Sequence, residues 1–119
     1  MILSGVTYEM PEIDFNAVCL LDTYGFDLMS GNKDISPLAQ IRAITAFASG
    51  TSLAISGKLI EAHVEDGGDF QTFAQATFEE FNKAVADSGF LQQMAKSFQA
   101  KQKTSNKKNS KPTADEQEI

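Results

Sequence analysis

Apolar residues recur at steps of three and four along most of the first 98 residues, which is the period of one face of an α-helix. The repeat is clearest after Asp69, and its apolar-face positions are Phe70, Phe73, Ala74, Thr77, Phe78, Phe81, Ala84 and Val85. Asp69 can cap the backbone N–H groups at the start of this segment. The pattern predicts a helix from about residue 70 that Ser88 and Gly89 interrupt, with its four phenylalanines mainly in the core.

Two helices are expected in the first half of the chain. The first follows Asp14 as N-cap and ends at Gly25, because glycine readily adopts the left-handed conformation that ends a helix. Its residues at helical spacing are Phe15, Val18, Cys19 and Leu21 or Asp22. The second starts at Ser36 and Pro37, since proline suits the first helical position, and ends at Gly50. We expect its buried face to comprise Leu38, Ile41, Ile44, Thr45 and Ala48.

A third helix is expected between a cap at Thr51 or Ser52 and a break at Gly67 and Gly68. Its apolar positions are Leu53, Ile55, Leu59, Ile60 and Val64. Gly57, in its middle, costs about 1 kcal/mol against alanine, so we expect close helix packing there. A short last helix follows Gly89, with Phe90, Leu91, Met94 and Phe98 as its apolar residues.

The two ends of the chain differ from this helical pattern. Val6 to Pro11 fits a short extended element, because Pro11 restricts the residue before it to extended conformations. After about Gln99 the apolar residues stop, and the segment Lys101–Lys111 cannot bury enough surface to offset its ordering entropy. We therefore predict a mainly α fold: a bundle of four to five helices in residues 1–98, a short N-terminal strand or hairpin, and a disordered, flexible, lysine-rich tail or linker over 99–119.

Charge is distributed unevenly between these parts. The net charge is −6, but residues 1–95 hold four basic and thirteen acidic residues, giving −9, and the remainder holds six Lys and three acids, giving +3. An acidic body opposes nucleic-acid binding. The lysine-rich tail could neutralise phosphates or serve as a soluble linker. Since it lacks arginine and interleaved aromatic residues, we favour the linker.

The residue types that carry catalysis or bind metals are scarce. His63 is the only histidine, and its position in the third predicted helix indicates a partly exposed helical residue. Cys19, the only cysteine, is expected to be a small core residue in a protein of a reducing compartment. The acidic run from Glu65 to Asp69 lacks the ligand spacing of a calcium loop and fits a junction between helices. We expect no enzyme activity, no cofactor and no metal.

The best candidate binding site is a set of apolar residues near the end of the predicted fold. A small helical domain rarely hides every large apolar side chain. Phe90, Leu91, Met94 and Phe98 could form an exposed patch for a partner or for self-association. No run of about 18 apolar residues exists, and the first eleven residues lack the features of a secretory signal, so we expect a soluble, cytoplasmic protein without membrane contact.

Four segments together resemble the tail assembly chaperones of long-tailed phages and prophages of Gram-positive bacteria. The opening YEMPEIDFNAVCLLD (residues 8–22) with YGFD (24–27) is similar to the start of that family. So are IRAITAF (41–47), GKLIEAH (57–63) with GGD (67–69), and FNKAVADSGFL (81–91), in which Leu91 replaces a second phenylalanine. The resemblance covers roughly residues 8–95 and rests on the order and spacing of these segments.

The resemblance implies a non-enzymatic protein of the host cytoplasm that is absent from the mature virion. Such chaperones bind the long tape measure protein, keep it soluble and help tail-tube subunits assemble around it. Many families also make a longer product by ribosomal frameshifting, whose added domain recruits the tail-tube protein, and this chain would be the shorter product. Two alternatives stay open: a small nucleic-acid-binding regulator that uses the lysine-rich tail, and a structural tail component.

Overall fold

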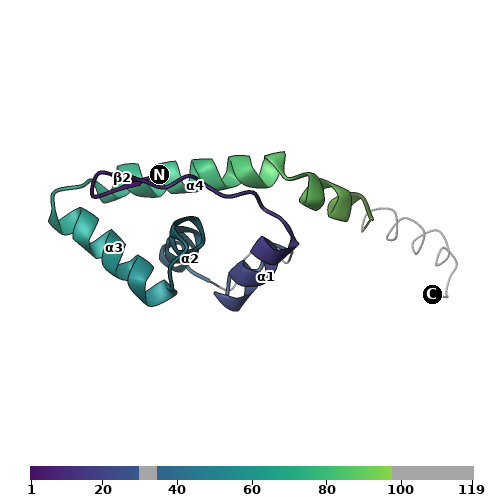
Figure 1. Cartoon of the computed structure of the whole chain (residues 1–119), viewed down its shortest axis with the longest axis horizontal. Coiled ribbons are helices and arrows are strands. Elements are labelled where there is room, and N and C mark those ends of the chain that lie inside the picture. The colour runs from purple at the N-terminus through teal and green to yellow at the C-terminus, as the bar shows by residue number, and fades with distance from the viewer. Residues whose placement is uncertain (30–34, 98–119) are drawn as a thin grey trace, which may run out of the picture. The chain divides into compact units, whose positions relative to one another are not determined.

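The computed structural model describes residues 1–29 and 35–97, which are mainly helical with a short N-terminal hairpin, as predicted. The strands are β1 (Ile2–Leu3) and β2 (Val6–Thr7), and the helices are α1 (Phe15–Thr23), α2 (Pro37–Ser49), α3 (Leu53–Glu65) and α4 (Phe70–Asp87) (Figure 1). Residues 89–97 form a fifth helix. Contacts divide the chain into two units, Met1–Ser88 and Gly89–Ile119. The predicted tail, residues 99–119, lies outside the described residues.

Each of the four long helices begins at a side-chain cap. Asp14, Ser36, Ser52 and Asp69 each accept a hydrogen bond from the backbone N–H three residues later. Of the two alternatives for the third helix, the cap is therefore Ser52. A cap satisfies one of the four N–H groups that a helix start leaves without an intrahelical partner.

Glycines end three of these helices by adopting positive φ. Gly50 has φ 70° at the end of α2. Gly25 (φ 86°) follows the end of α1, and Gly67 (φ 96°) follows the end of α3. After α3, the N–H of Gly68 reaches back to the carbonyl of His63 at 2.8 Å, as in a Schellman turn. The sequence thus places the helix ends where a left-handed residue is needed.

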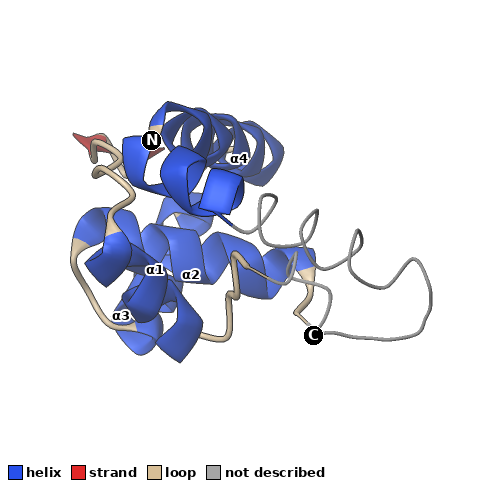
Figure 2. Ribbon diagram, turned by 90° about the vertical axis from the view of Figure 1, so that its right-hand side faces the viewer, coloured by secondary structure: helices blue, strands red, loops and turns tan. Residues whose placement is uncertain are grey.

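The N-terminal hairpin packs within the first unit. Ile2 pairs with Thr7 and Leu3 with Val6, and the two-residue turn between the strands is Ser4 (φ 50°) and Gly5 (φ 81°). Positive φ at both turn residues matches the right-handed twist of a tight hairpin. Leu3 is buried, and Figures 1 and 2 both place the hairpin beside α4.

The core of the first unit is organised around α2. Figure 1 views this helix nearly along its axis, and it packs against α1, α3 and α4. Its buried residues are Ile41, Ala43, Ile44, Thr45, Ala46 and Phe47. Beside it the rings of Phe26 and Phe81 lie 5.3 Å apart, within the range of favourable aromatic pairs. A helix buried on several sides needs the small residues that α2 supplies between its large ones.

Two predictions about burial were wrong. Cys19 was expected in the core but is exposed, because α1 buries Ala17, Val18 and Leu21, and each residue turns about 100° from the one before. Leu38 was expected on the buried face of α2 but is 66% exposed. It lies in the first turn of that helix, at an open hollow described below.

Candidate binding site

The α2–α3 corner is the framework of an open, mainly apolar surface in the first unit. Gly50 ends α2, Ser52 starts α3, and the chain bends by 102° between the two helices. The buried hydroxyl of Ser56 donates to the carbonyl of Arg42 across the corner at 3.2 Å and lies 2.9 Å from the carbonyl of Leu53. This bond fixes the two helices where their side chains cross.

A hollow of about 360 Å³ opens beside this corner. Its lining is Ser36, Leu38, Ala39, Ile41 and Arg42 from the start of α2, Gly57 and Ile60 from α3, and Phe70 from α4. Three helices therefore supply one surface whose walls are mainly aliphatic and aromatic. We call it the α2–α3 hollow.

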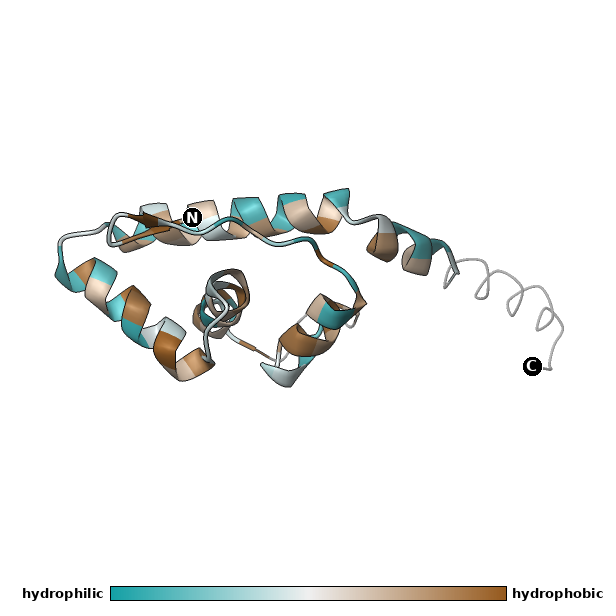
Figure 3. Cartoon of the chain, viewed as in Figure 1, coloured by the Kyte–Doolittle hydropathy of each residue, from teal (hydrophilic) through white to brown (hydrophobic). Residues whose placement is uncertain are grey.

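The α3 helix leaves part of its apolar surface uncovered. Only Ser56 is buried among its thirteen residues. Ile55 is 53% exposed and Val64 is also exposed, and Figure 3 shows hydrophobic residues along the helix. Leu53, Leu59 and Ile60 are partly buried, so the apolar side chains outside that stripe form a surface that a partner can cover.

Among the described residues, Arg42 is the one charged residue that lines the α2–α3 hollow. Its side chain is exposed, and it forms no ion pair with any residue in the described ranges 1–29 and 35–97. A Cβ added to Gly57 would lie 3.8 Å from the Cδ of Arg42, so the aliphatic part of Arg42 runs beside the bare backbone of Gly57. Close helix packing was expected at Gly57, but a Cβ would fit there, and its nearest neighbour is a side chain at ordinary contact distance.

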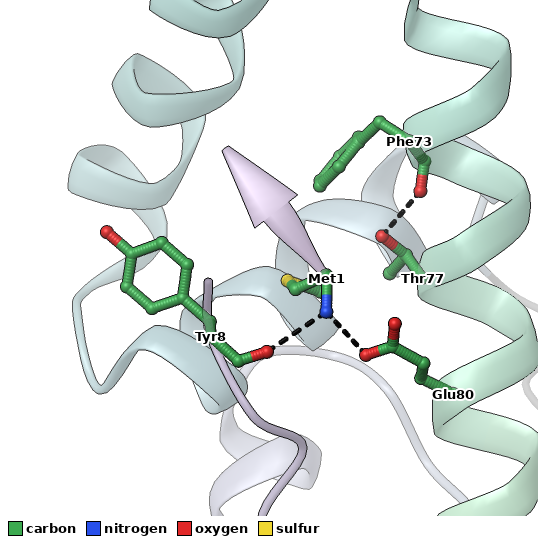
Figure 4. Close-up of polar contacts among 5 residues, drawn as sticks. All are labelled: Met1, Tyr8, Phe73, Thr77 and Glu80. Atoms are coloured by element: carbon green, nitrogen blue, oxygen red, sulfur yellow. Dashed lines mark hydrogen bonds and ion pairs between the residues drawn. The ribbon is translucent and has the colours of Figure 1, made fainter. Parts of the chain in front are cut away.

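A second hollow, of about 310 Å³, lies between the hairpin and α4. Its lining includes Met1, Ile2, His63, Phe73 and Glu80. The ammonium group of Met1 donates to the carbonyl of Tyr8 at 3.0 Å and pairs with the Glu80 carboxylate at 2.5 Å (Figure 4). These two charges pair with each other, and the carboxylate of Asp69, which also lines this hollow, accepts hydrogen bonds from Thr72.

His63 has a structural position, as its place in a helix suggested. It is partly buried, its Nδ1 accepts a hydrogen bond from the Ser4 N–H at 2.9 Å, and its ring lies 5.7 Å from that of Phe73. No group of three or more His, Cys, Asp or Glu is placed to hold a metal ion within the described part of the chain. The residues from Glu65 to Asp69 form the predicted junction between two helices.

Asp69 shows how the junction is stabilised. The hydroxyl of Thr72 donates to its carboxylate at 2.5 Å, and the backbone N–H of Thr72 donates at 2.9 Å. These hydrogen bonds, the side-chain one first, lower the pKa of Asp69 below its ordinary value of 3.8. The charged carboxylate is therefore the form that caps α4.

The predicted patch lies mostly on the fifth helix. Phe90 is 36% exposed, and Leu91 and Met94 are partly buried. Phe90 and Met94 are four residues apart in the helix of residues 89–97, so they share one face. Phe98 lies outside the described residues. The lysines of the predicted tail, from Lys101 onward, do so as well.

Sequence reasoning missed the α2–α3 hollow, although it named several of its residues. Leu38 and Ile41 were assigned together to the core of α2, and Phe70 to the core of α4. The signals available were Gly57, a helical glycine without a local reason, and Arg42, a charge within an apolar helix. Neither shows by itself that three helices leave an opening.

The apolar character of α2 and α3 also bears on membranes. Within the described residues no single helix has the length and hydropathy to cross a bilayer, whereas α2 and α3 reach that length and composition only as a pair bent by 102°.

Comparisons of this chain with protein-family models, with curated proteins and with solved structures find no match.

Proposed function

We propose that this chain is a phage tail assembly chaperone that binds the tape measure protein, keeps it soluble and assists assembly of the tail tube. The proposal is based on the resemblance of residues 8–95 to that family. The observation that supports it in the fold is α3, an apolar helix with one buried residue beside an open apolar hollow. A non-enzymatic binding role needs such a surface.

The chemistry of a tape measure protein fits this surface. A long, helical and aggregation-prone polymer presents repeated apolar faces, and a helix can lay such a face into an apolar groove. Each contact can be weak, because many chaperone copies bind along one polymer. The charge of −9 over residues 1–95 would keep the coated polymer in solution.

Two surfaces are candidates for this contact within the described residues. One is the α2–α3 hollow, and the other is the face of the fifth helix that carries Phe90, Leu91 and Met94. The C-terminal tail would be a linker, through which a longer frameshifted product presents an added domain to the tail-tube protein. The chaperone would act in the host cytoplasm and be absent from the finished virion.

Co-expression with the long tape measure gene tests the proposal. The expected result is a soluble tape measure protein that co-purifies with this chain. An insoluble tape measure protein that shows no association would refute the proposal. Replacing Phe90 and Phe98 by aspartate should weaken the association and leave the far-UV circular dichroism unchanged, if the patch on the last helix takes part. A loss of helicity would instead place these residues in the core.

Nucleic-acid binding is the second candidate, and one observation favours it. The bend of 102° between α2 and α3 lies in the range of about 90–120° that helix-turn-helix motifs use. The exposed side of α3 opposes it, because Lys58 is accompanied there by Glu61 and Glu65. Retention on a nucleic-acid column that falls steeply with salt and disappears without residues 100–119 would support this alternative.

The third candidate function, a structural component of the tail, differs in the location of the protein after assembly. A structural protein stays in the purified virion, whereas an assembly chaperone leaves before the tail is complete. Mass spectrometry of purified particles separates the two. The downstream DNA is equally informative: an overlapping −1 frame followed by a very long helical gene would support the chaperone.

A further inference from the structure

Positive charge is rare in the first unit, which makes its location informative. The described residues up to 95 contain three Lys or Arg side chains: Arg42, Lys58 and Lys83. Lys58 is paired with Glu61 at 3.6 Å, and both side chains are largely exposed. Arg42 has no ion-pair partner in the described part of the chain, and it lines the α2–α3 hollow. Lys83 likewise has no ion pair among the described residues, but it does not line this hollow. Of the described cations, Arg42 alone therefore lies within the apolar hollow of an acidic domain.

A guanidinium group in such a place recognises carboxylates better than an ammonium group does. It is planar, always charged, and can donate two parallel hydrogen bonds to one carboxylate. The apolar walls of Leu38, Ile60 and Phe70 would partly exclude water from that contact, which strengthens it relative to a contact in bulk solvent. The same walls require an apolar side chain next to the carboxylate.

We propose that the α2–α3 hollow binds one turn of an amphipathic helix of the tape measure protein, in which a large apolar residue has Asp or Glu three or four residues away. The apolar residue fills the space between Leu38, Ile60 and Phe70, and the carboxylate pairs with Arg42. This spacing follows from the helix, because residues three and four apart lie on one face. The inference rests on the proposed function and specifies the partner surface within it.

The net charge of the whole domain further restricts which segments of the partner can bind. Residues 1–95 carry −9, so a strongly acidic segment would be repelled before it reached Arg42. The segment therefore carries an isolated acid in neutral or basic surroundings. Acid-rich helices and purely apolar helices should both bind more weakly.

The test uses the full chain and overlapping synthetic peptides of about 25 residues that span the tape measure protein, with binding followed by fluorescence anisotropy. Leu38→Asp removes the apolar contact, Arg42→Met removes the charge and keeps the aliphatic length, and Arg42→Glu reverses the charge. Lys58→Met and Lys58→Glu are the matched controls, because Lys58 lies on α3 but does not line the hollow. Leu38 and Arg42 are exposed, so these variants should fold, and thermal melts check this.

We expect Arg42→Met to weaken binding of the tightest peptide about tenfold, and Arg42→Glu and Leu38→Asp to weaken it more. The two Lys58 variants should bind like the wild type. Changing the acid of that peptide to lysine should weaken wild-type binding and restore binding to Arg42→Glu. This reciprocal rescue is the decisive result, since a general loss of stability would not produce it.

The outcomes separate this inference from the function on which it rests. If the wild-type chain neither solubilises the co-expressed tape measure protein nor binds any peptide, the proposed function is overturned, and this inference with it. If the wild type binds but Leu38→Asp and Arg42→Glu bind equally well, the function stands and the hollow is not the site. If Leu38→Asp abolishes binding while both Arg42 variants match the wild type, the apolar contact stands and the carboxylate partner is refuted.

Discussion

Gly68 and His63 form a contact whose energy can be derived from the structure. Gly68 follows the end of α3, and its N–H donates to the His63 carbonyl. Its φ is not positive, so its backbone suits an L-residue. A Cβ built on Gly68, however, would lie 2.6 Å from both Cδ2 and Cε1 of the His63 ring and closer still to Nε2. The substitution Gly68→Ala must therefore displace the imidazole.

The cost of moving the ring follows from what holds it. The ring accepts a hydrogen bond from Ser4 and packs against Phe73. Losing a neutral hydrogen bond costs about 0.5–1.5 kcal/mol, and losing an aromatic contact costs a similar amount. Alanine also lowers the conformational entropy of the unfolded chain, which raises the free energy of unfolding by about 0.4–1 kcal/mol and offsets part of this loss. We expect Gly68→Ala to lower the free energy of unfolding by about 1–2 kcal/mol.

A double-mutant cycle followed by urea denaturation tests this explanation. In the His63→Ala background the ring is absent, so Gly68→Ala should there be neutral or slightly stabilising. The midpoint of the far-UV circular dichroism transition gives the four stabilities, provided that the denaturant slope stays constant. An equal cost of Gly68→Ala in both backgrounds would refute the steric reasoning. A wild-type midpoint for the single variant would refute it as well.

Three further predictions concern the same unit. Gly57→Ala should raise the free energy of unfolding by about 0.5–1 kcal/mol, because the added Cβ meets its nearest neighbour at 3.8 Å and alanine favours the helix; a lower urea midpoint would contradict this. Ser88→Ala should lower that free energy by about 1–2 kcal/mol, because the buried Ser88 hydroxyl donates to the Ile13 carbonyl at 2.6 Å; an unchanged midpoint would show that the carbonyl finds another donor. Since the folded pKa of Asp69 lies below 3.8, its charged cap stabilises the protein at neutral pH, and this contribution is lost as the pH falls through the folded value. Stability measured from about pH 5 to about pH 2 should therefore fall more for the wild type than for Asp69→Asn, and parallel curves would contradict this.

The sequence predicted the helix starts and three helix ends well because caps are local. A carboxylate or hydroxyl at Asp14, Ser36 or Asp69 needs only the backbone N–H three residues ahead. Gly25, Gly50 and Gly67 adopt positive φ for an equally local reason, the absence of a Cβ. The apolar period likewise identified helices, since it reflects one face of a helix whatever lies opposite.

Burial of particular side chains was less predictable because it depends on neighbours from elsewhere in the chain. Phe73 and Phe81 are buried as expected, whereas Phe70 and Phe78 on the same helix are only partly buried. Cys19 has apolar sequence neighbours but lies on the exposed side of α1. The period of a helix gives its apolar face, but only the packing of other helices decides how much of that face is covered.

The candidate sites illustrate the same division. Phe90, Leu91 and Met94 could be named from the sequence, because adjacent apolar residues at helical spacing are visible there. The α2–α3 hollow could not, since Leu38, Gly57 and Phe70 come from three helices and meet only when the chain bends by 102° after α2. The sequence by itself determined where helices start and that the domain is acidic, through local hydrogen bonding and composition. Only the tertiary structure decided that Arg42 lies among the apolar walls of Leu38, Ile60 and Phe70, because that placement depends on how three helices cross.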